Sequence, residues 1–182
     1  DIVQKNVRTC KKCNLCDTRT NAVPGIGNQR ADVVFIGEAP GKNEDLHGEP
    51  FIGTAGKILD NALENAGLIR DDVYITNIVK CRPPNNRVPT DTEKLMCSNY
   101  LECELTIINP KIICLLGNTP FHSILGGKEI SKNHGKFISK DNRMYFVTFH
   151  PAATIYNQKL VNVFKNDIKK LMNELQKIKH AD

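Results

Sequence analysis

Four of the seven cysteines in this 182-residue chain fall into two groups whose spacing is typical of a metal or iron–sulfur site. Cys10 and Cys13 are separated by two lysines, and Cys81 and Cys97 lie far downstream with fifteen residues between them. Four cysteine thiolates can hold either zinc or a [4Fe–4S] cluster, and spacing alone does not choose between the two. The polar residues around Cys10 and Cys13 argue against ordinary buried core cysteines.

The three remaining cysteines are less typical of metal ligands. Cys16 extends the first group to C-x2-C-x2-C, so the choice of ligands at that end stays open. Cys103 follows a helical apolar pattern and Cys114 lies within an apolar run, so both are expected in the core. The odd number of cysteines and an N-terminus without a signal-peptide pattern favour a reducing compartment, and we expect a cytoplasmic protein.

Polar side chains also follow three apolar runs. Glu38 lies in the loop Gly37-Glu-Ala-Pro-Gly41, which offers backbone N–H groups but matches neither a P-loop nor a dinucleotide fingerprint. Asn77 interrupts an apolar run and needs hydrogen-bond partners, either in a neighbouring loop or on the edge of a bound base. His150 is either a satisfied surface histidine or a donor in a pocket.

Two further residues near the glycine loop are compatible with more than one role. Phe51, between Pro50 and Ile52, is either part of the core or an aromatic platform for a flat ligand. Glu44 follows the loop closely and is either solvated or part of the same pocket.

The elements that would position these residues alternate between strand and helix. Strands are expected at 32–36, 73–79 and 111–116, with a hairpin of 137–138 and 144–149. Helices are expected over the first nine residues, around 58–66, from the capping box at Thr90 to about 108, and over 160–178. This order favours a three-layer α/β/α sandwich around a central, mostly parallel sheet, in a single domain of residues 1–182. Ligand sites in such sheets gather at the carboxyl ends of strands, where these polar residues fall.

Composition sets broad limits on partners. The net charge of +5 permits a polyanionic partner without requiring one. No apolar run approaches the ~20 residues of a transmembrane helix, so no membrane partner is expected.

The motifs GEAPG, PFIGTAG, ITNIVKCRPPNNRVP and HPAA, in this order, resemble those of the family-4 uracil-DNA glycosylases. These enzymes are the iron–sulfur members of the uracil-DNA glycosylase superfamily, and the resemblance spans residues 10 to about 170. It implies a DNA-repair hydrolase that removes flipped-out uracil from single- or double-stranded DNA and leaves an abasic site. It also implies a [4Fe–4S] cofactor and is compatible with a monomer.

The resemblance further implies roles for individual residues. The residues that bind uracil would be those of the pocket loop, the aromatic platform that stacks on the ring, and the amide that bonds to its edge. These are Gly37, Ala39, Pro40, Gly41, Phe51 and Asn77. Catalysis would fall to Glu38, which positions water, His150, which donates to uracil O2, and Glu44, which helps shape the pocket. The cluster ligands would be Cys10, Cys13, Cys81 and Cys97, with Cys16 a bystander.

The same resemblance suggests how DNA is held. Arg82, Arg87 and the basic C-terminal helix are candidates for phosphate contacts, and residues 154–157 for a contact with the groove or the base stack.

Two alternative functions remain: a non-catalytic iron–sulfur or zinc protein that binds nucleic acid, and a flavodoxin-like nucleotide-binding protein. The first has no need for Glu38, Asn77 and His150 together, and the second expects a phosphate-binding loop. Family-5 enzymes lack an acidic residue at the position of Glu38, and the X-type relatives carry an insertion that is absent after Cys81.

Overall fold

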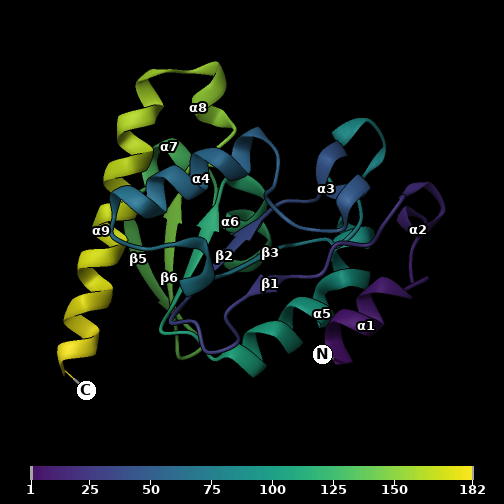
Figure 1. The fold of residues 1–182 in the computed structure, drawn as a ribbon, viewed down its shortest axis with the longest axis horizontal. Helices are drawn as coiled ribbons and strands as arrows, with labels where there is room; N and C mark the ends of the chain where they lie inside the picture. Colours follow the sequence, from purple (N-terminus) through teal and green to yellow (C-terminus); the bar gives the residue numbers. More distant parts are fainter. Residues whose placement is uncertain (1, 182) are drawn as a thin grey trace.

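The computed structural model describes residues 2–181, which form a six-stranded sheet with helices on both faces (Figure 1). In chain order the strands are β1 (Ile26–Gly27), β2 (Val33–Gly37), β3 (Tyr74–Asn77), β4 (Ile112–Leu116), β5 (Lys136–Lys140) and β6 (Arg143–Thr148). Their spatial order is β1-β3-β2-β4-β6-β5. The four inner strands are parallel, and β1 and β5 pair antiparallel at the two edges. The predicted α/β class with a mostly parallel sheet is confirmed.

The helices connect the strands and cover the sheet. They are α1 (Ile2–Arg8), α2 (Leu15–Thr18), α3 (Lys42–His47), α4 (Thr54–Asn65), α5 (Asp91–Ile108), α6 (Asn118–Leu125), α7 (Ile130–Asn133), α8 (Ala153–Tyr156) and α9 (Lys159–Ala181). Two short 3-10 turns, η1 (Arg70–Asp72) and η2 (Pro84–Asn86), interrupt the connections. Within residues 2–181, no helix is both long and apolar enough to cross a membrane.

Each face of the sheet has its own apolar core. On one face, side chains of α4 and α9 such as Leu63 and Phe164 pack with Phe35 of β2. On the other face, side chains of α1, α5 and α6 pack with Ile36 and the alternate residues of the inner strands. Strands buried on both faces are apolar at every position, which explains the continuous apolar runs 33–36 and 112–116. The result is the three-layer sandwich that the sequence predicts.

Local signals locate α5 well and β3 less well. Thr90 accepts a hydrogen bond from the backbone N–H of Glu93, and the Glu93 carboxylate accepts one from the backbone N–H of Thr90 in return, so the predicted capping box starts α5. The strand predicted over 73–79 is shorter, because β3 ends at Asn77. The backbone N–H groups of Ile78 and Val79 instead bond to carbonyls of the glycine loop.

Candidate active site

A pocket of about 540 Å³ lies at the carboxyl ends of the inner strands. It brings together eight of the residues that the sequence singles out, namely Glu38, Ala39, Pro40, Gly41, Glu44, Phe51, Asn77 and His150. The loop after β2 supplies the first four, β3 ends in Asn77, and His150 follows β6. Parallel strands bring their carboxyl ends to one edge, so segments far apart in sequence meet here.

Gly37 lies behind the pocket wall, where no side chain would fit. A Cβ at this position would lie 2.5 Å from Asn77 Oδ1 and 2.5 Å from Phe51 Cζ. Both contacts are far shorter than van der Waals contact. The glycine therefore lets the aromatic ring and the amide approach the same strand end.

Asn77 carries an unusual buried polar atom. Its side chain is 2% exposed, and within the described part of the chain its Oδ1 is the buried side-chain oxygen or nitrogen that has no hydrogen-bond partner. An orphaned buried acceptor costs about 1–3 kcal/mol. Because the residue lines the pocket, a bound ligand with an N–H donor would satisfy it. Within the described residues, no neighbouring loop donates a hydrogen bond to Asn77 Oδ1.

Phe51 forms an aromatic wall in a strained backbone conformation. Its φ of 52° lies in the left-handed region, which is unfavourable for a bulky residue. Arg70 holds it there, because Nη1 donates to the Phe51 carbonyl at 2.8 Å and Nη2 donates to the carbonyl of Pro50. Gly56 permits this approach, since a Cβ there would lie 1.7 Å from the Phe51 oxygen. The Phe51 ring stacks against His150 with centroids 5.5 Å apart.

Glu44 holds the same segment from the other side. Its Oε1 accepts hydrogen bonds from the backbone N–H groups of Ile52 at 3.1 Å and Gly53 at 2.8 Å. Gly53 is the N-cap of α4, so the carboxylate also lies at the positive end of that helix. Glu44 is therefore tied to the Phe51 loop and is not simply solvated.

Glu38 occupies the rim of the pocket. Its Oε2 accepts a hydrogen bond from the hydroxyl of Thr119, near the start of α6. Thr119 also lines the pocket. The hydroxyl therefore fixes one oxygen of the Glu38 carboxylate at the rim of the pocket.

The contacts of His150 define its tautomer. Burial lowers the pKa of His150 to about 4, although Glu44 nearby raises it in part, so the ring is neutral near pH 7. The backbone N–H of Ala152 donates to Nδ1 at 3.1 Å. The proton of the neutral ring is then on Nε2, which makes this nitrogen a hydrogen-bond donor.

The four predicted cysteine ligands line a second, smaller cavity. Cys10, Cys13, Cys81 and Cys97 surround it, and Cys16 also reaches its wall. No group of three or more histidine, cysteine, aspartate or glutamate side chains in the described range 2–181 is arranged to hold a single metal ion. Cys16 contacts the carboxylate of Asp17 at 3.5 Å.

Nitrogen donors point at two of these sulfurs. Arg19 Nη1 lies 2.9 Å from Cys81 Sγ, and the backbone N–H of Lys80 donates to Cys97 Sγ at 3.3 Å. Burial raises the pKa of the Cys81 thiol, against the effect of Arg19, and raises the pKa of Cys97 to about 11, against the effect of Lys80. Thiolates at these positions therefore need additional positive charge nearby.

Sequence reasoning missed several residues of both sites. Thr119, Arg70 and Arg19 act through contacts that are distant in sequence, and no local pattern marks them. Lys80 directly follows an apolar run, and nothing in that local pattern distinguishes a buried lysine from a solvated one. Arg87, a candidate for phosphate contacts, is paired with the carboxylate of Glu93 at 2.7 and 2.9 Å.

The fold and the site together define an α/β protein whose strand-end pocket is suited to a planar heterocycle, with a cysteine site close by. The aromatic wall, the unpaired amide oxygen and the histidine N–H donor all belong to residues that line this one pocket.

Comparison with known proteins identifies the family. The family described as the uracil DNA glycosylase superfamily matches residues 24–176 of this chain. The chain is 46% identical to the type-4 uracil-DNA glycosylase of Sulfurisphaera tokodaii, over 93% of this chain and 81% of that protein. It is 45% identical to the type-4 enzyme of Saccharolobus solfataricus, over 96% and 86%, and 43% identical to that of Archaeoglobus fulgidus, over 94% and 90%. The chain belongs to the uracil-DNA glycosylase superfamily, and the resemblance to its type-4 members is confirmed.

Proposed function

We propose that the pocket accepts a uracil flipped out of DNA and that the protein hydrolyses its N-glycosidic bond, leaving an abasic site. The observation that carries this proposal is the buried, unpartnered Oδ1 of Asn77. Uracil presents an N3–H donor beside its O4 acceptor, which matches the acceptor and donor of an asparagine amide. Cytosine presents the reverse pattern at the same two positions, so the amide would reject it.

The pocket walls support the same ligand. Phe51 would stack on the uracil ring, and Ala39, Pro40 and Gly41 would enclose it with backbone and small side chains, while Gly37 behind them would let Phe51 and Asn77 come close. Glu44 and Arg70 would fix the Phe51 segment, which makes both of them positioning residues.

The chemistry follows from where charge develops. As the C1′–N1 bond breaks, its electron pair goes to uracil and the sugar becomes cationic. The Nε2–H of neutral His150 donates to uracil O2 and stabilises the leaving anion, as an oxyanion hole does. Glu38 orients a water molecule, stabilises the cationic sugar and accepts a proton as the new C1′–O bond forms.

The cysteine site would hold a [4Fe–4S] cluster on Cys10, Cys13, Cys81 and Cys97. Four cysteines around one cavity, with two N–H groups directed at their sulfurs, suit such a cluster. Bound there, the cluster would supply a structural cross-link between the N-terminal segment and the middle of the chain. Cys16 would remain a bystander.

The substrate would be uracil-containing DNA, bound by a monomer in base excision repair. Tyr156 in α8 is 90% exposed and comes six residues after His150. An exposed aromatic side chain so close to the pocket suits contact with the groove or an unstacked base.

A uracil-containing single-stranded oligonucleotide tests the proposal. The protein should release free uracil and leave an alkali-labile site, and Asn77→Asp should lower the rate by placing a carboxylate against the uracil O4. The exposed Asn61→Asp variant is the matched control and should retain wild-type activity. DNA binding without uracil release by the wild-type protein would favour the non-catalytic alternative instead.

A further inference from the structure

A fully buried ion pair lies behind the pocket, between Lys80 and Glu104. The Lys80 Nζ and Glu104 Oε2 atoms are 2.6 Å apart, and both side chains are 1% exposed. Neither residue lines the pocket. Burying two charges is expensive, and replacing such a pair with apolar side chains is often neutral or stabilising. Its presence therefore calls for a role beyond stability.

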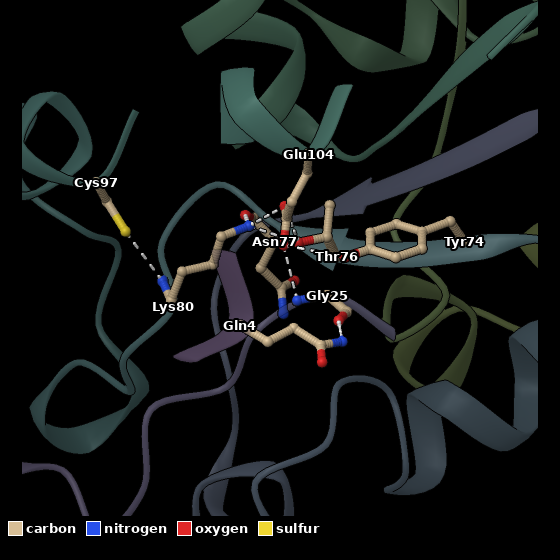
Figure 2. A network of polar contacts seen from close by, with 8 residues as sticks. All are labelled: Gln4, Gly25, Tyr74, Thr76, Asn77, Lys80, Cys97 and Glu104. Carbon is tan, nitrogen blue, oxygen red and sulfur yellow. Dashed lines mark hydrogen bonds and ion pairs between the residues drawn. The ribbon is translucent and has the colours of Figure 1, made fainter. Parts of the chain in front are cut away.

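The Lys80 ammonium group is fixed by three oxygens. Nζ donates to Glu104 Oε2, to the hydroxyl of Thr76, and to the backbone carbonyl of Asn77 at 2.9 Å (Figure 2). The Thr76 hydroxyl in turn donates to Glu104 Oε2 at 2.8 Å. All three donors of the ammonium group thus have partners, and one of them holds the peptide group of Asn77.

Glu104 is equally constrained. Its Oε1 accepts hydrogen bonds from the backbone N–H of Gly25 at 2.9 Å and from the hydroxyl of Tyr74 at 3.3 Å. These contacts anchor the carboxylate to β3 and to the segment before β1. A carboxylate with four donors has little freedom to rotate, so it provides a rigid support for Lys80.

Asn77 needs such a support. It is the last residue of β3, and the peptide that follows it is held on its N–H side, because Ile78 donates to the carbonyl of Gly37 at 2.9 Å, which leaves its carbonyl to a second partner. The direction of its amide depends on where this strand end lies and on the side-chain torsions, so a shift of that peptide would move Oδ1 relative to a ligand. The Lys80 ammonium group holds the carbonyl of that peptide in place.

We propose that Lys80 is a positioning residue that orients Asn77 to read the edge of uracil, with Glu104 and Thr76 holding Lys80 in place. The proposal rests on the proposed function of the pocket. The backbone N–H of the same lysine donates to Cys97 Sγ. Lys80 therefore also joins the cysteine site to the residue that selects the base (Figure 2).

The test is the double variant Lys80→Met/Glu104→Met, which removes both charges and leaves neither unpaired. The measurement is inhibition by free uracil during multiple-turnover excision. We expect the inhibition constant to rise roughly three- to tenfold, the effect of misaligning one hydrogen bond. Affinity for an oligonucleotide with an abasic site, and visible absorption from the cluster, should stay at the wild-type level. An unchanged inhibition constant in the folded variant would overturn the proposal.

A background lacking the amide distinguishes positioning from general destabilisation. In Asn77→Ala protein, adding the two substitutions should not weaken uracil inhibition further, because their effect passes through the missing side chain. Additive losses would contradict the proposal. If the double variant does not fold, Thr76→Val provides a second test, because it retains both charges. It should raise the inhibition constant about twofold by loosening Lys80. An unchanged inhibition constant in Thr76→Val would also refute the proposal.

The ion pair of half-buried Arg143 and exposed Glu102, on β6 and α5, provides a matched control. Arg143→Met/Glu102→Met removes the same number of charges and should leave inhibition by uracil unchanged. An equal loss in this control would refute a specific role for Lys80. Failure of the proposed function itself is recognised separately, because the wild-type protein would then release no uracil.

Discussion

Replacing Glu44 by glutamine separates a positioning role from a direct role in catalysis. Glu44 Oε1 accepts two backbone hydrogen bonds, from Ile52 and Gly53. A hydrogen bond to a charged acceptor contributes about 1.5–3 kcal/mol and one to a neutral acceptor about 0.5–1.5 kcal/mol. Glutamine retains an acceptor oxygen, so Glu44→Gln should weaken the Phe51 loop by only about 1–2 kcal/mol after solvent screening.

That loss should reduce single-turnover uracil excision by no more than about thirtyfold. Glu44→Ala removes the acceptor of both hydrogen bonds and releases the strained Phe51 segment, so we expect a reduction on the order of a hundredfold. Glu38→Gln removes the group that activates water and should reduce the rate by about 10²–10⁴. Rates are measured with a uracil-containing oligonucleotide at saturating enzyme, alongside thermal unfolding.

The exposed Glu64 of α4 provides the control, and Glu64→Gln should behave as wild type. A drop for Glu44→Gln as large as that for Glu38→Gln, at an unchanged melting temperature, would refute this reasoning. Glu44 would then be acting on the water or the sugar itself.

Three further predictions concern His150, Gly56 and the cysteine site. Because burial lowers the pKa of His150 to about 4 from 6.5, the folded state resists protonation, and stability should fall as pH decreases from about 6.5 to 4. Denaturant unfolding of His150→Gln should show a shallower fall over that range, and parallel curves would contradict the assignment. Gly56→Ala should clash with the Phe51 carbonyl, lower the melting temperature and slow excision, whereas wild-type values would disprove the close contact. Cys81→Ser should abolish broad visible absorption while Cys16→Ser retains it, and a colourless, zinc-containing wild-type protein would reject the iron–sulfur cluster.

The framework could be predicted because it depends on local patterns. The capping box of Thr90 and Glu93 involves residues three apart, and the continuous apolar run at 33–36 reflects burial on both faces of the sheet. Glu38, Asn77 and His150 could be grouped because each lies at or near the end of a predicted strand, and parallel strands bring such ends together.

The supporting contacts could not be predicted in this way. Arg70 holds Phe51 from nineteen residues away, and its neighbours Asp71 and Asp72 give no hint of that contact. The hydroxyl of Thr119 reaches Glu38 across eighty-one residues. Such pairs depend on how the loops pack over the sheet, and side-chain periodicity carries no information about that packing.

The segment between Cys81 and Cys97 links the cysteine site to the shape of the pocket. The segment leaves Cys81, lines the pocket with Arg87 and Val88, and returns to the cysteine cavity at Glu93. The bidentate pair of Arg87 and Glu93 holds its middle and neutralises the arginine. A disulfide that closes a fifteen-residue loop stabilises the folded state by about 3 kcal/mol, because it lowers the entropy of the unfolded chain. A cluster bound by Cys81 and Cys97 would act similarly, so its loss should loosen this wall of the pocket before it disturbs the sheet.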